Sequence, residues 1–109
     1  MATVKKEHII KMVTDTEFET GIIRGKLNSL IIDSEDYVSV TIESSLGYLI
    51  FNNSSHQGIK YYAPRALLQG SQANIMVQDQ FDKFKLNERV MIRIAGPADA
   101  EVSIILRFD

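Results

Sequence analysis

The stretch that decides the fold is Arg89-Val90-Met91-Ile92-Arg93-Ile94-Ala95, followed after a short break by Glu101-Val102-Ser103-Ile104-Ile105-Leu106-Arg107-Phe108. In each run apolar residues recur at every second position, which is the period of a β-strand with one buried face. Ile105 is an exception to this alternation. Gly96-Pro97-Ala98-Asp99 lies between the runs and is typical of a turn. The two runs therefore predict an antiparallel hairpin.

The same alternation occurs earlier in the chain. Residues 37–43 place Val38, Val40 and Ile42 on one face, and Tyr48-Leu49-Ile50-Phe51 is apolar throughout, as in a strand buried on both faces. Further strands are predicted over 27–32, 59–63 and 74–78.

Polar segments separate these strands. The acidic residues 33–36 are interpreted as a turn between two strands, and residues 52–58 are the most loop-like segment of the chain. Residues 65–69 fit either a short helical turn or an extended edge. Residues 79–87 are interpreted as an irregular connection whose two Phe rings close one end of the core.

The N-terminal segment leaves alternatives open. Residues 3–13 alternate as a strand does, but a helix would group Ile9, Ile10 and Val13. We favour strands for this segment and for residues 14–20. The other possibility is that residues 1–20 form an extended arm that reaches a neighbouring molecule.

These strands define a single all-β domain over residues 1–109. The chain contains 14 isoleucines, and branched side chains of this kind pack well on a pleated sheet. Seven to nine short strands joined mostly by short connections predict an antiparallel β-sandwich, jelly-roll-like in form.

Composition excludes several classes of function. There are no cysteines, only two histidines and a net charge of -2, which argue against thiol chemistry, a histidine metal cluster and a nucleic-acid partner. No secretory signal and no apolar stretch of membrane-spanning length occurs, so we expect a cytoplasmic location and no membrane partner. We expect no cofactor, no metal and no enzymatic activity.

Three polar features are candidate sites. His8 and His56 are interpreted as structural or solvent-facing histidines, because neither has the neighbours that a metal site or a Ser–His pair needs. Asp33-Ser34-Glu35-Asp36 has the carboxylates of a calcium site but lacks the EF-hand spacing, which favours a charged turn.

The best candidates for partner binding are Tyr48, Tyr61, Tyr62 and Arg65, since exposed tyrosine beside arginine is common at interfaces. Adjacent strand residues point to opposite faces, so one of Tyr61 and Tyr62 turns inward. The alternatives are rings that cap the core and rings that stack on a sugar. A solvent face shared by Arg89, Arg93 and Arg107 is also expected, which could bind phosphate but is better suited to a protein.

The closing stretch, residues 86–97 followed by 101–108, resembles the small β-sandwich proteins of tailed-phage particles, which include capsid decoration proteins and tail or baseplate components. The resemblance implies a non-enzymatic virion subunit, present in many symmetric copies, that binds itself and a larger shell or tail protein. The alternative is a small carbohydrate- or ligand-binding sandwich module.

Overall fold

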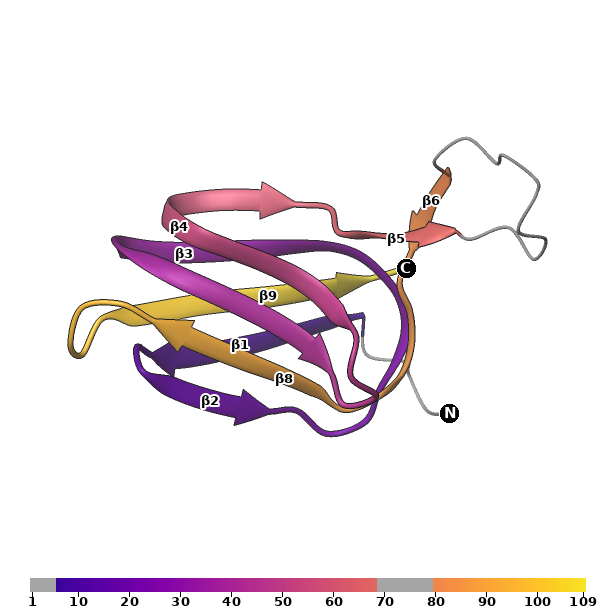
Figure 1. Ribbon diagram of the computed structural model, residues 1–109, viewed down its shortest axis with the longest axis horizontal. Coiled ribbons are helices and arrows are strands. Elements are labelled where there is room, and N and C mark those ends of the chain that lie inside the picture. Colours follow the sequence, from indigo (N-terminus) through magenta and orange to yellow (C-terminus); the bar gives the residue numbers. More distant parts are fainter. Residues whose placement is uncertain (1–5, 69–79) are drawn as a thin grey trace.

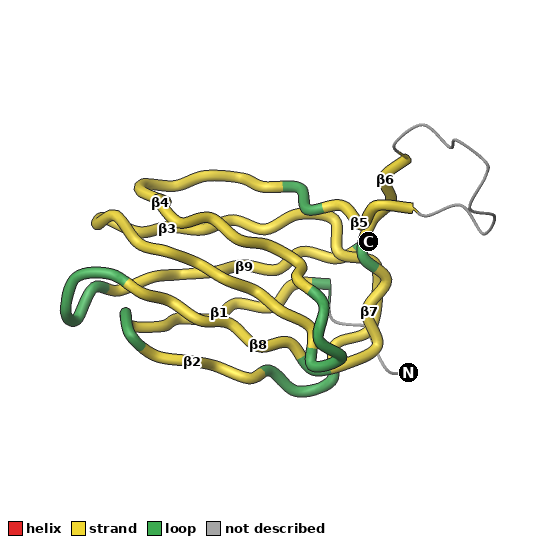
Figure 2. Tube along the Cα trace, in the orientation of Figure 1, coloured by secondary structure: helices red, strands yellow, loops and turns green. Residues whose placement is uncertain are grey.

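A computed structural model describes residues 6–68 and 80–109, so the strand expected over 74–78 lies outside the described part. The prediction of an all-β antiparallel fold is confirmed, and the described residues contain strands and no helix (Figure 2). The strands are β1 (Glu7–Val13), β2 (Thr16–Glu19), β3 (Ile23–Ser44), β4 (Leu49–Tyr62), β5 (Arg65–Leu68), β6 (Gln80–Lys83), β7 (Lys85–Glu88), β8 (Val90–Ala95) and β9 (Glu101–Phe108).

Two layers share the long strands β3 and β4, which bend and run through both (Figure 1). The first half of β3 pairs with β9 and its second half pairs with β8. β4 follows β3 along both halves. One layer therefore has the order β1-β9-β3-β4, and the other has the order β2-β8-β3-β4.

The connections between the layers make this arrangement a jelly roll. The chain crosses from one layer to the other between β1 and β2, between β2 and β3, within β3, within β4, between β4 and β8, and between β8 and β9. The strands joined by these crossings take the same lateral order in both layers: β1 and β2 come first, β9 and β8 second, and the halves of β3 and of β4 third and fourth. This is the double Greek-key pattern of the eight-stranded jelly roll. The jelly-roll-like expectation thus holds at the level of strand order.

The predicted C-terminal hairpin is wrong in its pairing. β8 and β9 have the expected bounds and inward residues, but each pairs with a different half of β3, and no pairing joins them in the described part of the chain. Alternation identifies the buried face of a strand but not its neighbour. At the crossing, a Cβ on Gly96 would lie 3.1 Å from Tyr37 O and 3.1 Å from Val38 Cγ1, so the absence of a side chain permits this close approach.

Two predicted connections are strand instead. The turn expected over 33–36 belongs to β3, whose register shifts between Ser34 and Val38 as the strand bends. The loop expected over 52–58 belongs to β4, which bends at Gly58 with a φ of 81°. Polar residues gather there because a bend at the end of a sandwich faces solvent. Residues 65–68 are extended, so of the two alternatives, a short helical turn and an extended edge, the second is confirmed.

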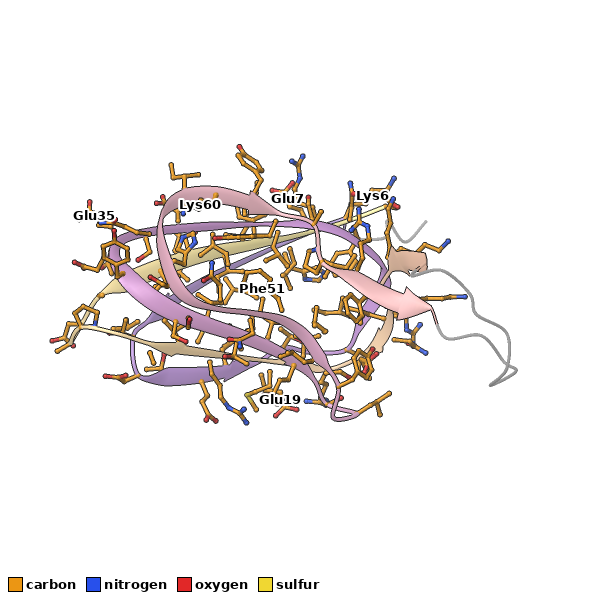
Figure 3. The ribbon with its side chains drawn as sticks, turned by 45° about the horizontal axis from the view of Figure 1, so that its top comes forward. Lys6, Glu7, Glu19, Glu35, Phe51 and Lys60 are labelled. Atoms are coloured by element: carbon orange, nitrogen blue, oxygen red, sulfur yellow. The ribbon has the colours of Figure 1, made fainter. Side chains whose placement is uncertain are left out.

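The core fills the space between the layers. Its most deeply buried members include Leu30, Ile32, Val40, Ile92 and Ile104, which all have exposed fractions of 0%. The N-terminal residues contribute as well, since β1 pairs with β9 and buries Ile10 and Met12. Figure 3 shows the side chains, with Glu7 of β1 and Glu19 of β2 on opposite sides of the molecule.

Candidate interaction surfaces

Tyr48 and Arg65 line one surface groove, together with Leu49, Ala66, Phe84 and Lys85; its volume is about 470 Å³. The Tyr48 ring stacks on the Phe84 ring with centroids 5.9 Å apart and planes inclined by 4°. Its hydroxyl donates a hydrogen bond to Glu88 Oε1 at 2.6 Å. Tyr48 is therefore held in place by the fold, and only part of its ring faces the groove.

The environment of Tyr48 raises the pKa of its phenol above the ordinary value. Burial disfavours the phenolate, and the hydrogen bond to the Glu88 carboxylate holds the proton on the phenol. The negative charge of Glu88 acts in the same direction. A groove of this kind keeps Tyr48 as a neutral hydrogen-bonding group.

Tyr61 and Tyr62 point to opposite faces of β4, as expected for adjacent residues. Tyr61 is 71% exposed on the outside, whereas Tyr62 is half-buried and packs against Phe51 with ring centroids 4.7 Å apart. Arg65 Nη1 donates to Asn28 O and Pro64 O. Of the four predicted residues, Tyr62 thus faces inward and Tyr61 lies on an outer sheet face. Tyr48 and Arg65 line the groove.

His56 is fully buried and both of its ring nitrogens have partners. Nε2 lies 2.8 Å from Gly58 O, which can only accept, so Nε2 carries the proton. Nδ1 then accepts from Tyr62 Oη at 2.8 Å, and Tyr62 Oη accepts from Asn53 Nδ2 at 3.0 Å. This histidine ties the two ends of the bend in β4 together, and it lies in a strand rather than in the expected loop.

The remaining polar candidates are structural in their contacts. His8 is half-buried with its ring set edge-on to Phe108, at a centroid distance of 5.6 Å. Asp33, Glu35, Asp36, Asp99 and Glu101 surround an open cleft of about 710 Å³ at the bend of β3. Among residues 6–68 and 80–109, no three histidine, aspartate or glutamate side chains are grouped so that they could hold a metal ion.

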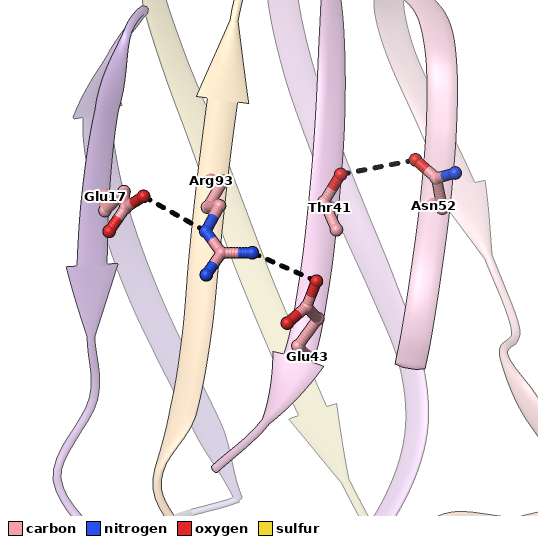
Figure 4. Close-up of polar contacts among 5 residues, drawn as sticks. All are labelled: Glu17, Thr41, Glu43, Asn52 and Arg93. Carbon is pink, nitrogen blue, oxygen red and sulfur yellow. Dashed lines mark hydrogen bonds and ion pairs between the residues drawn. The ribbon is translucent and has the colours of Figure 1, made fainter. Parts of the chain in front are cut away.

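The outer face of the β2-β8-β3-β4 layer carries a set of polar contacts between strands (Figure 4). Arg93 Nε donates to Glu17 at 3.1 Å and Arg93 Nη1 donates to Glu43 at 3.0 Å, so one guanidinium joins three strands. Thr41 donates to Asn52 at 3.3 Å on the same face. The expected shared face of Arg89, Arg93 and Arg107 is wrong, because β8 and β9 belong to different layers and Arg107 lies on the other side.

The outer face of the β1-β9-β3-β4 layer instead exposes several large apolar side chains. Ile9 is 61% exposed and Ile59 is 64% exposed, and Tyr61 stands with them. Ile31 and Ile105 lie between them and are half-buried. This face was not predicted from the sequence, although Ile105 is an exception to the apolar alternation of its strand.

The pairing and the crossings define the class of this protein as an all-β jelly-roll sandwich, one of whose outer faces exposes Ile9, Ile59 and Tyr61. No family model, no characterised protein and no solved structure matches the chain. No helix in the described ranges is long and apolar enough to cross a membrane.

Proposed function

We propose that the chain is a non-enzymatic structural protein that acts through protein–protein contacts, as a decoration, tail or baseplate subunit of a phage virion. The observation that carries the proposal is the difference between the two outer faces. On the outer face of the β2-β8-β3-β4 layer, Arg93 pairs with Glu17 and Glu43. The outer face of the other layer leaves Ile9, Ile59 and Tyr61 more than half exposed. Exposed apolar patches of this kind mark interaction sites.

The fold is compatible with this role without deciding it. Jelly rolls build viral shell proteins and lectins alike, so function depends on the surface and not on the strand order. The resemblance of the closing strands to phage sandwich proteins favours the virion over other assemblies. The exposed side chains of Ile9, Ile59 and Tyr61 favour a protein partner, since exposed apolar patches mark interaction sites.

The test is incorporation into particles purified by density gradient from cells that encode the chain. We expect the chain to sediment with the particles at a constant ratio to their main shell or tail protein. The double substitution Ile9→Ser with Tyr61→Ser should abolish this, whereas Leu46→Ser, at an equally exposed apolar position away from the face, should not. Particles purified from these cells that do not contain the chain would overturn the proposal.

A second candidate is carbohydrate binding in the groove of Tyr48 and Arg65. Two stacked rings beside a guanidinium give the groove an apolar wall and a donor, as sugar sites have. A glycan array would give a signal that Arg65→Ala removes. Binding that is absent, or that survives this substitution, would exclude the groove.

A further inference from the structure

One row of apolar side chains crosses the whole outer face of the β1-β9-β3-β4 layer. Ile9 pairs with Ile105, Ile105 pairs with Ile31, and Ile31 pairs with Tyr61. Their neighbours along each strand, such as Ile10, Leu106 and Leu30, are buried, so the row itself points outward. The row is therefore continuous from one edge strand of the layer to the other.

The residues on either side of this row carry opposite charges on β1. Glu7 lies two residues before Ile9 and Lys11 lies two residues after it, so both share its face at about 6–7 Å along the strand. The flanking rows continue across β9 and β3 with Arg107 and Ser29 on the Glu7 side. On the Lys11 side they continue with Ser103 and Asp33.

We propose that this face binds a second copy of the chain, face to face, about a two-fold axis that runs along the apolar row. This inference rests on the proposed function, because it names the partner of the same face. A two-fold axis along the row exchanges its two sides, so Glu7 of each copy lies over Lys11 of the other. The apolar residues of the row then meet their own equivalents.

The charges explain why a second copy fits better than an unrelated partner. Each copy supplies both members of a Glu7–Lys11 pair, which is the self-complementarity that an isologous interface requires. The other outer face lacks this property, because its central Arg93 is already engaged by Glu17 and Glu43 of the same copy. Sheets that pack face to face in this way bury the apolar row at their centre and leave the ion pairs at the rim.

The test is the molar mass of the purified chain, measured by light scattering and sedimentation equilibrium over a concentration series. We expect a dimer that Ile9→Ser and Tyr61→Ser convert to monomer. Glu7→Lys places lysine over lysine and should weaken the dimer at least tenfold, about 1.4 kcal/mol. Adding Lys11→Glu in the same chain restores opposite charges and should restore the dimer.

Glu19→Lys on β2 is the matched control, since it makes the same change at an exposed position on the other layer. It should leave the dimer unchanged, and circular dichroism should give one fold for all variants. A wild-type monomer at every concentration overturns the inference, as does a double charge swap that fails to restore association. Incorporation of such a monomer into particles would leave the proposed function standing, whereas a dimer that never enters particles would refute the function alone.

Discussion

The phenol of Tyr48 donates a hydrogen bond to the buried carboxylate of Glu88, with the two oxygen atoms 2.6 Å apart. The second oxygen of the same carboxylate accepts a hydrogen bond from Ser44 Oγ. Two hydroxyl groups thus replace the water that a carboxylate would otherwise need. The contact fastens the turn after β3 to β7, which leads into β8.

We expect Tyr48→Phe to lower the free energy of unfolding by about 1–2 kcal/mol, because it leaves one oxygen of a buried carboxylate without its donor. Urea denaturation at neutral pH measures the loss. Tyr37→Phe is the control, since Tyr37 is 63% exposed, and it should change little. Equal effects of the two substitutions would contradict the role given to the contact.

Stability should also depend on the protonation of Tyr48 at alkaline pH. Burial and Glu88 raise the pKa of this phenol in the folded state above its value of about 10 in the unfolded chain. The folded state then binds the phenolic proton of Tyr48 more tightly than the unfolded chain does. The resulting stabilisation is fully present below the unfolded pKa and is lost as the pH rises through the folded pKa. Tyr48→Phe should flatten this part of the curve of unfolding free energy against pH.

Ile22 and Ile23 are adjacent and chemically identical but differ in burial. Ile23 is 1% exposed and belongs to the core, while Ile22 is 59% exposed. Ile23→Ala should cost about 2–5 kcal/mol through the cavity it leaves. Ile22→Ala should cost less than about 0.5 kcal/mol, as surface substitutions do. Similar losses in chemical denaturation would mean that the start of β3 packs differently.

The ion pairs of Arg93 should contribute little despite their good geometry. Arg93 and its two partners are all at least one-third exposed, so solvent and salt screen the attraction. We expect Arg93→Gln to lower the free energy of unfolding by no more than about 1 kcal/mol. The difference from wild type should shrink in concentrated sodium chloride; a difference that persists there would point to a packing role for the side chain.

The bend of β4 depends on the hydrogen-bond chain through Tyr62. Tyr62→Phe keeps the ring against Phe51 but leaves Nδ1 of the fully buried His56 without a donor. We expect Tyr62→Phe to lower the free energy of unfolding by about 1–3 kcal/mol. Asn53→Ala removes the outer member of the chain and the exposed hydrogen bond that Asn53 Oδ1 accepts from Ser55 N, and it should cost less. Thermal melting of the two variants ranks them, and the reverse order would contradict the role given to the Tyr62 hydroxyl.

Much of the fold could be predicted from local pattern, and the failures share one cause. Alternation located β8, β9 and the second half of β3, together with the residues that each buries. It could not show that β8 and β9 pair with two halves of one strand, because pairing depends on partners distant in sequence. The polar bends at 33–36 and 52–58 were mistaken for connections, since solvent exposure gives a bend the composition of a loop.

The candidate site was predicted less well than the fold. Tyrosine and arginine identities could be read from the sequence, and Tyr61 does face outward. Their grouping could not, because Tyr48 and Arg65 approach each other only through strands that fold back. The apolar row was missed because its four members come from four separate strands and alternate with core residues of the same kind.

The pairing of β1 with β9 has a consequence for how the molecule is made. Every other strand of the described residues lies between these two in the sequence, so β1 leaves the ribosome long before the strand that covers its edge is synthesised. The sandwich can close only after translation has passed Phe108, and such long-range closure is slow. In that interval β1 presents an unpaired edge, which nascent chains on neighbouring ribosomes are able to extend. Slower expression at lower temperature should therefore raise the yield of correctly folded protein.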